Sequence, residues 1–150
     1  NFTFEGRKTD RTRGLRTLNH EELEQGDVSL TYISKIMNRK YSRTDSFRKI
    51  IQSIWHQINS SDEVFVVGEI LDDDTIKGGT GWGAEFTKLC NKPLYVFDQK
   101  KDAWFKWNKT EWEKTEAPVI TCEHFCGTGT RYPQDNAKKA ISGLFERSFS

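Results

Sequence analysis

Two apolar runs with a glycine-rich segment between them constrain this chain most. The first run covers residues 63–68 and the second residues 94–97, and both are rich in β-branched and aromatic side chains. Apolar residues at successive positions are typical of strands buried on both faces. Between the runs lie a polar loop over 69–77, a cluster of glycines and a helical segment from about Trp82 to Cys90. This order predicts two parallel neighbouring strands joined by a right-handed crossover.

Helical periodicity appears on both sides of this unit. Residues 46–59 repeat apolar side chains at i, i+3, i+4, i+7, i+8 and i+11, which predicts an amphipathic helix. A capping box that opens at Asn19 predicts another helix over 19–37, weakened by Gly26. A last helix is expected over about residues 137–145, where apolar residues line one face.

The remaining strands are expected in the last third of the chain. Residues 104–114 alternate aromatic and charged side chains around an Asn-Lys turn, which predicts a β-hairpin with one apolar face. Residues 118–121 are expected to form a short strand, and the glycine-rich residues 126–130 a loop. The fold class is therefore α/β: a Rossmann-like three-layer fold with a mainly parallel sheet and a β-hairpin after the glycine-rich unit.

Length and charge bound the organisation and the partners. The 150 residues fit one domain, which we expect over 19–150, whereas the basic and polar residues 1–18 indicate an arm or irregular lead-in. The formal net charge of +1 gives no global attraction to nucleic acid or membrane, so sequence-specific nucleic-acid binding is not expected. No segment approaches the roughly 20 apolar residues that span a bilayer, and the start lacks a signal-peptide pattern. The expected location is cytoplasmic.

The segment Gly78-Gly79-Thr80-Gly81 is the main candidate binding site. In open parallel sheets, ligands bind where the carboxyl ends of strands lead into helix N-termini. Glycine lets the backbone approach a ligand and adopt positive φ, while free amides and the helix dipole favour an anion. The expected ligand group is a phosphate or carboxylate, with Trp82 beside it. The alternative is a tight turn that needs glycine for its geometry alone.

Glu85 is the candidate catalytic residue. It follows Gly81 by about one helical turn, so its carboxylate is expected to reach back to the glycine segment. There it would serve as a nucleophile or as an acceptor for ribose hydroxyls. The alternative is an acid in the first helical turn that complements the helix dipole.

Two further parts of the chain are expected to line the same site. One is a second glycine-rich segment that offers amides, hydroxyls and a guanidinium ahead of a helix. Its members are Gly127, Thr128, Gly129, Thr130 and Arg131. The other is Asp98, which closes the second apolar run and could accept from ribose hydroxyls. The alternatives are a flexible connection for the glycine segment and a turn for Asp98, which the following Gln-Lys favours.

Other chemistry has weaker support in the sequence. Cys122, His124 and Cys126 supply only three zinc ligands at alternate positions, without a second pair. The three aspartates at 72–74 are more typical of an acidic loop than of a magnesium site. Cys90 lies on the apolar side of its helix and is expected in the core. We therefore expect neither a metal nor a bound cofactor.

Several strings resemble a known superfamily. Residues 78–85, Gly-Gly-Thr-Gly-Trp-Gly-Ala-Glu, resemble the Gly-Gly-x-Gly-x-x-x-Glu signature of the SLOG superfamily, which includes lysine-decarboxylase-like phosphoribohydrolases. With residues 92–96, Lys-Pro-Leu-Tyr-Val, the chain is also similar to nucleoside deoxyribosyltransferases. Strings at 54–59, 77–82, 92–99 and 125–131 resemble a SLOG/Rossmann-like family common in phages and bacteria. The likeness runs over about residues 19–145.

The resemblance implies a domain that binds a nucleotide or another phosphate-bearing small molecule. Its enzymatic version is an N-glycoside hydrolase or transferase that uses Glu85. Relatives begin with a strand and a Ser-Gly-Gly-Ala-x-Gly-Ala-Asp-like loop that this sequence does not match, and many have Gln at the position of Glu85. The alternative is a non-catalytic interaction module in which the aromatic hairpin, with Trp104, Trp107 and Trp112, mediates a homodimer or docks a partner.

Overall fold

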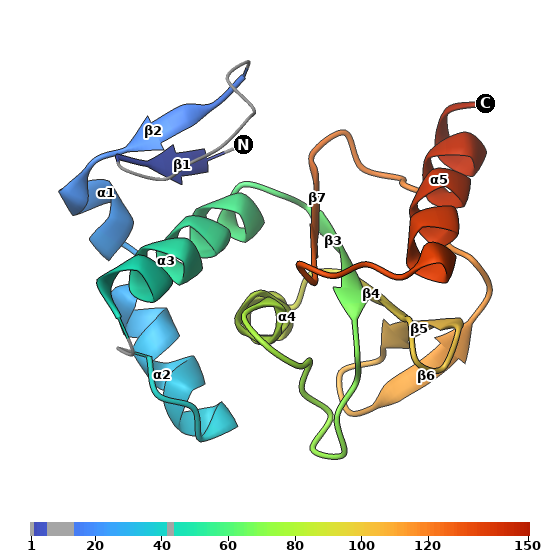
Figure 1. Cartoon of the computed structure of the whole chain (residues 1–150), viewed down its shortest axis with the longest axis horizontal. Coiled ribbons are helices and arrows are strands. Elements are labelled where there is room, and N and C mark those ends of the chain that lie inside the picture. The colour runs from blue at the N-terminus through green and yellow to red at the C-terminus, as the bar shows by residue number, and fades with distance from the viewer. Residues whose placement is uncertain (1, 6–13, 42–43) are drawn as a thin grey trace.

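The computed structural model describes residues 2–5, 14–41 and 44–150 of the chain. Figure 1 shows the order of its elements. They are β1 (Phe2–Phe4), β2 (Arg16–Leu18), α1 (His20–Glu24), α2 (Asp27–Met37), α3 (Asp45–Asn59), β3 (Glu63–Gly68), α4 (Thr80–Leu89), β4 (Leu94–Asp98), β5 (Ala103–Trp107), β6 (Trp112–Thr115), β7 (Phe125–Gly129) and α5 (Asp135–Phe149).

The main sheet has five strands in the order β6-β5-β4-β3-β7. Strand β3 pairs in parallel with both β4 and β7, whereas β4 with β5 and β5 with β6 are antiparallel. The α/β class is confirmed. The parallel pairing of β3 and β4, which precede and follow α4 in the chain, and the hairpin of β5 and β6 are confirmed as well. The sheet is mixed, however, because the hairpin extends it by two antiparallel pairings, so its expected mainly parallel character is not confirmed.

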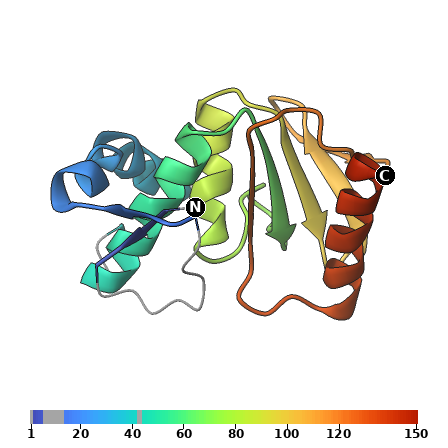
Figure 2. The same cartoon turned by 90° about the horizontal axis from the view of Figure 1, so that it is seen from above.

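Helices cover both faces of this sheet. In Figure 2, α5 lies on one side and α4 on the other, and α2 and α3 pack on the outer side of α4. The larger apolar core fills the α4 side, around Val64, Val66 and Trp82. A smaller core around Phe65 and Leu144 fills the α5 side. Because the sheet covers one side of α4 and helices α2 and α3 cover the other, every residue from Thr80 to Thr87 is buried.

The helix predictions are confirmed with one exception. Helix α3 carries the expected amphipathic pattern, and the capping box at Asn19 is present at the start of α1. The single helix expected over 19–37 is instead two helices, α1 and α2, separated at Gly26. Packing requires glycine at the junction, since a Cβ on Gly26 would lie 2.5 Å from the ring of Trp55.

The expected strand and loop after the hairpin are wrong. Residues 118–121 form no strand, and the glycine-rich residues 125–129 are strand β7 rather than a loop. The carboxylate of buried Glu63 explains the first result, since it accepts from the Thr121 amide at 2.6 Å and the Cys122 amide at 2.8 Å. The free side of β3 explains the second, because it supplies the backbone ladder that Gly127 and its neighbours join.

The lead-in expected over residues 1–18 is not irregular in its described parts. Strands β1 and β2 pair in parallel, and Phe4 and Leu18 pack with Leu23 of α1 in a small separate core. The basic residues Arg7, Lys8, Arg11 and Arg13 lie outside the described residues. In the described part of the chain, no helix is long and apolar enough to cross a membrane.

The segment that leaves β3 folds back on itself before α4. Ile70 and Ile76 form an antiparallel bridge, and the Lys77 amide donates to the Glu69 carbonyl at 3.0 Å. We call residues 69–77 the finger. It separates the end of β3 from the start of α4, in the place where the sequence predicts a loop, and the bridge gives that loop a folded shape.

Three cationic side chains secure other segments by donating to main-chain carbonyls. Lys92 Nζ donates to the Ile58 carbonyl at 2.7 Å and thereby holds the end of α3. Arg147 donates to the Pro118 carbonyl at 3.1 Å, which fixes the coil before β7 against α5. Lys88 donates to the Asp74 carbonyl of the finger at 2.9 Å. All three cations therefore bind neutral oxygens, and Lys88 also binds the Glu85 carboxylate.

Candidate functional site

The glycine segment forms the N-terminus of α4. Gly78 has φ +76° and Gly79 is the N-cap, so the helix begins at Thr80. The Gly81 and Trp82 amides donate to the Gly78 and Gly79 carbonyls, each at 3.1 Å. The amides of Gly79 and Thr80 have no acceptor among the described residues. The helix therefore opens with free donors and the positive end of its dipole, as expected from the sequence.

Packing explains several of the glycines without a ligand. Gly78 has a backbone conformation that favours glycine. A Cβ on Gly81 would lie 2.1 Å from the Ile76 carbonyl oxygen, and one on Gly83 would lie 2.9 Å from Ile54 and Ile58 of α3. Gly79 is the exception, since its φ is −61° and its Cβ would meet only Ile51, at 3.7 Å.

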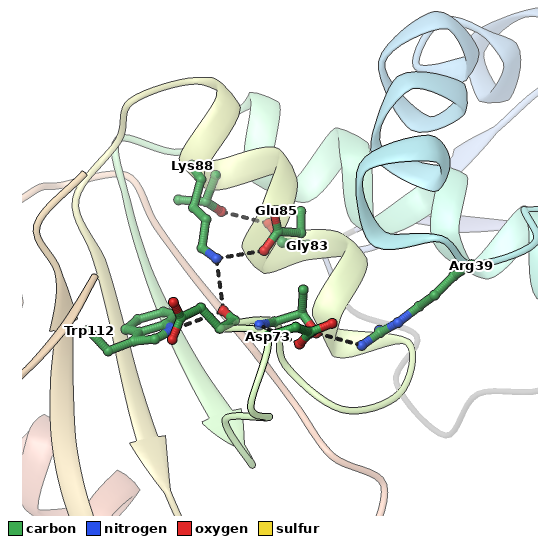
Figure 3. Close-up of polar contacts among 9 residues, drawn as sticks. Arg39, Asp73, Gly83, Glu85, Lys88 and Trp112 are labelled. Atoms are coloured by element: carbon green, nitrogen blue, oxygen red, sulfur yellow. Dashed lines mark hydrogen bonds and ion pairs between the residues drawn. The ribbon is translucent and has the colours of Figure 1, made fainter. Parts of the chain in front are cut away.

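Arg39, just after α2, joins the glycine segment to the finger. Its Nη1 donates to the Gly78 carbonyl at 3.1 Å, and its Nη2 donates to the Thr75 hydroxyl at 2.9 Å. The Thr75 hydroxyl in turn donates to Asp73 at 2.6 Å. Figure 3 shows the Arg39 side chain extending toward Asp73. Hydrogen bonds from the Thr75 side chain and amide lower the pKa of Asp73. The guanidinium is thus fixed beside the helix N-terminus.

A cavity of about 480 Å³ lies against this N-terminus. Its lining residues are Arg39, Lys40, Phe47, Gly78, Gly79 and Trp82. Two cations, an aromatic ring and the backbone of the glycine segment therefore surround one space. Trp82 contributes little surface, because it is 2% exposed and packs against Tyr41 and Phe47.

Glu85 does not reach back to this cavity. Its carboxylate forms an ion pair with Lys88 at 2.6 Å, and both side chains are almost fully covered, at 10% and 12% exposure. Figure 3 shows the pair on the side of α4 that faces the finger and the hairpin, away from Arg39. The expected position near the ligand is wrong because Glu85 lies in the second turn of α4, where the helix points it toward Lys88.

The aromatic side chains of the hairpin pack against the rest of the molecule. Lys88 Nζ lies 4.0 Å from the centre of the Trp107 ring and 5.2 Å from that of Trp112, whose indole donates to the Asp74 carbonyl at 2.9 Å. Trp104 is buried against Phe97 on the other face. The hairpin is therefore not an exposed aromatic surface, and the expected dimer or docking contact through it is not supported.

Asp98 is fully buried and its acceptors are occupied. One carboxylate oxygen accepts from the Ile70 amide at 2.9 Å, and the other accepts from the Lys100 and Lys101 amides, both at 2.9 Å. The turn interpretation accounts for these contacts. Asp98 ties the turn after β4 to the base of the finger.

The second glycine segment does not line the cavity. Gly127, Thr128 and Gly129 belong to β7, and the Thr130 amide continues the ladder by donating to the Val67 carbonyl at 3.0 Å. Arg131 follows the strand and is exposed. The Thr128 side chain would lie 3.8 Å from a Cβ on Gly83 of α4. The cavity is thus lined by the first glycine segment and by none of the residues of the second.

The cysteines and histidines form no second candidate site in the part of the chain that the structure describes. There, no group of His, Cys, Asp or Glu side chains is arranged to hold a metal ion. Burial raises the pKa of Cys126 to about 11, and burial also raises the pKa of Cys90. Both are free cysteines, and neither environment activates a thiol.

Sequence reasoning missed three residues of the cavity. Arg39 and Lys40 precede α3 and Phe47 lies in its first turns, so α3 or most of it, together with β3, separates them in sequence from the glycine segment, and no motif connects them to it. The only local signal is a pair of cations directly after a helix that ends at Met37.

Comparison of the chain with models of protein families, with curated proteins and with solved structures gave no match.

Proposed function

We propose that this chain is a Rossmann-like, SLOG-like domain that binds a nucleotide or nucleotide derivative, with a phosphate at the N-terminus of α4. The observation that carries the proposal is the cavity that Arg39 and Lys40 line together with Gly79, at a helix N-terminus whose Gly79 and Thr80 amides have no acceptor among the described residues. Free amides, the helix dipole and two cations all favour negative charge in the same place.

Two properties favour a nucleotide over a bare anion. The cavity volume falls within the roughly 300–1,000 Å³ typical of small-molecule sites, which exceeds what one phosphate needs. The partly exposed ring of Phe47 also lines the cavity and offers an apolar surface for a base. The phosphate would then lie toward Gly79, and the base toward Phe47.

The arrangement supports binding more than catalysis. An N-glycoside hydrolase that used Glu85 would need its carboxylate beside the ribose, but Lys88 holds that carboxylate on another side of α4. The proposal is therefore a binding domain, and the enzymatic version requires Glu85 to leave its ion pair.

A titration with matched lysine variants tests the binding site. Nucleoside monophosphates and NAD are added to the protein, and the melting temperature and binding isotherm are measured, because a ligand of the folded state raises its stability. Lys40→Gln should weaken binding by about tenfold, since a charged hydrogen bond contributes roughly 1.5–3 kcal/mol. Lys35→Gln removes the same charge from an exposed residue in the last turn of α2, so it should leave the affinity unchanged. The proposal fails if no nucleotide shifts the melting temperature, or if both variants bind like the unmodified protein.

Chromatography of the same mixtures tests turnover. We expect each nucleotide to be recovered intact, because Glu85 is paired with Lys88. Release of free base by the unmodified protein but not by Glu85→Gln would replace the binding function with the enzymatic one.

A further inference from the structure

Among the described residues, strand β7 has a pairing partner on only one side of its backbone. It is the last strand of the sheet, and its even-numbered residues face β3: the Thr130 amide donates to the Val67 carbonyl, and the His124 carbonyl accepts from the Asp62 amide. Backbone groups alternate in direction along a strand. The amides and carbonyls of Phe125, Gly127 and Gly129 therefore point outward, and the amides have no acceptor among the described residues.

Nothing in the sequence of β7 protects this edge. The strand contains no charged residue, and its exposed positions 127 and 129 are glycines, with open space at the Cβ position of Gly127. The opposite edge of the sheet differs, because β6 carries exposed Glu113 and Lys114. Charged side chains on an edge prevent pairing with another strand, whereas a neutral edge favours it.

Exposed apolar side chains accompany the open edge. Phe145 and Phe149 of α5 are 44% and 66% exposed, and their rings lie 6.1 and 6.4 Å from that of Phe125. Val119, in the coil before β7, is 45% exposed. An apolar patch beside unpaired backbone groups is typical of a surface that another chain covers.

We propose that two copies of this chain pair along β7, antiparallel and around a two-fold axis at Gly127. Only this register brings all the outward residues opposite one another: Gly127 faces Gly127 of the second copy, and Phe125 faces Gly129. Each outward amide then meets an outward carbonyl, so the two sheets become one. A two-fold axis also makes the contact closed, with the same surface used on both sides.

The charges that flank β7 agree with this register. Glu123 and Arg131 are exposed and lie equally far from Gly127, one on each side. The two-fold axis places Glu123 of each copy opposite Arg131 of the other, so the pair occurs twice. The same register sets the Phe125 ring across from the side-chain-free Gly129, a cross-strand arrangement in which an aromatic ring covers a glycine. Charge and shape thus make β7 complementary to itself.

The first test compares two substitutions at the axis. Gly127→Pro removes the central outward amide, and proline is tolerated where the amide faces away from the sheet. Gly127→Ala is the matched control, because it keeps the amide and its Cβ enters open space. Sedimentation over a series of concentrations should show a dimer for the unmodified chain and for Gly127→Ala, and a monomer for Gly127→Pro. A monomer at every concentration for the unmodified chain, or a dimer that survives in folded Gly127→Pro, overturns the proposal.

A charge exchange decides the register and remains informative if the proline variant does not fold. Glu123→Arg and Arg131→Glu should each weaken the dimer by roughly tenfold, because two attractive contacts become repulsive at once. The double variant should restore the unmodified dimerisation constant. Equal dimerisation in all four proteins contradicts the register, and circular dichroism shows that each variant is folded.

Discussion

Individual glycines in the segment 78–83 have different physical explanations. Gly78 adopts a positive φ, and Gly81 allows α4 to pass the Ile76 carbonyl at a distance that no side chain permits. Gly83 allows the close approach of α3. Gly79 has neither requirement, although it lines the cavity. A glycine motif that looks uniform in sequence thus combines packing with a position that is free to serve a ligand.

Alanine substitutions should separate these roles. Gly81→Ala forces the Ile76 backbone and Arg39 to move, so it should lower the free energy of unfolding by about 1–3 kcal/mol, as overpacking does. Gly79→Ala places its Cβ in an ordinary contact and should change that free energy by less than about 0.5 kcal/mol. Urea denaturation measures both. Equal losses in the two variants would show that the packing explanation is incomplete.

At the scale of elements, one carboxylate connects α2 to α3. Asp27, the first residue of α2, accepts from the Tyr41 hydroxyl at 2.6 Å and from Arg48 and Gln52 of α3 at 2.8 Å each. Burial alone would raise the pKa of Asp27, but the hydrogen bonds from Tyr41, Gln52 and Arg48 outweigh it and lower the pKa. Burial and the bond to Asp27 raise the pKa of Tyr41. The contact adds to the apolar packing of α2, whose Leu30, Ile33 and Met37 are buried in the larger core while Val28 and Tyr32 on its outer face are exposed.

Acid should therefore weaken the packing of α2 on α3. Because the folded pKa of Asp27 lies below the ordinary 3.8, its contribution to stability is complete above about pH 4 and decreases as the pH falls through the lowered pKa. Thermal unfolding between pH 6 and pH 2.5, roughly that window, should show a smaller loss for Asp27→Asn than for the unmodified chain. Tyr41→Phe removes one donor and should give an intermediate slope. Identical slopes in all three proteins would exclude Asp27 as a source of the acid sensitivity.

Elements with strong local signals could be predicted, and those that depend on distant partners could not. The periodicity of α3 and the apolar run of β3 identify both elements directly. Strand β7 could not be found, because Gly127 and Gly129 have low strand propensity and take their conformation from the free side of β3. The glycine start of α4 was predicted, but Arg39 enters the cavity only through tertiary packing.

At the scale of the whole molecule, β3 is the centre of the structure. It has a strand on each side and helices over both faces, and all its residues are buried (Figure 2). Its Val64 and Val66 side chains enter the larger core, while Phe65 and Val67 enter the smaller one. Both cores therefore meet at β3, and one cannot be lost without disturbing the other.

Amide hydrogen exchange should reproduce this organisation. The amides of Val64 to Val67 should exchange most slowly, since they open only with both cores. In dilute protein, the even-numbered amides of β7 should be protected and those of Phe125, Gly127 and Gly129 should exchange quickly, because only the former face β3. Uniform protection along β7 in the monomer would contradict the described ladder.

The bonds from Lys88, Lys92 and Arg147 to main-chain carbonyls determine how parts of the structure respond to salt. Dissolved salt strongly screens the attraction between two exposed opposite charges, whereas it weakens a direct hydrogen bond from a cation to a carbonyl oxygen less, because that bond acts only at contact distance. The finger, the end of α3 and the coil before β7 should therefore keep their hydrogen bonds to these cations at high salt concentration. The same salt concentration should weaken the exposed ion pairs that Glu69 forms with Lys77 and Lys100.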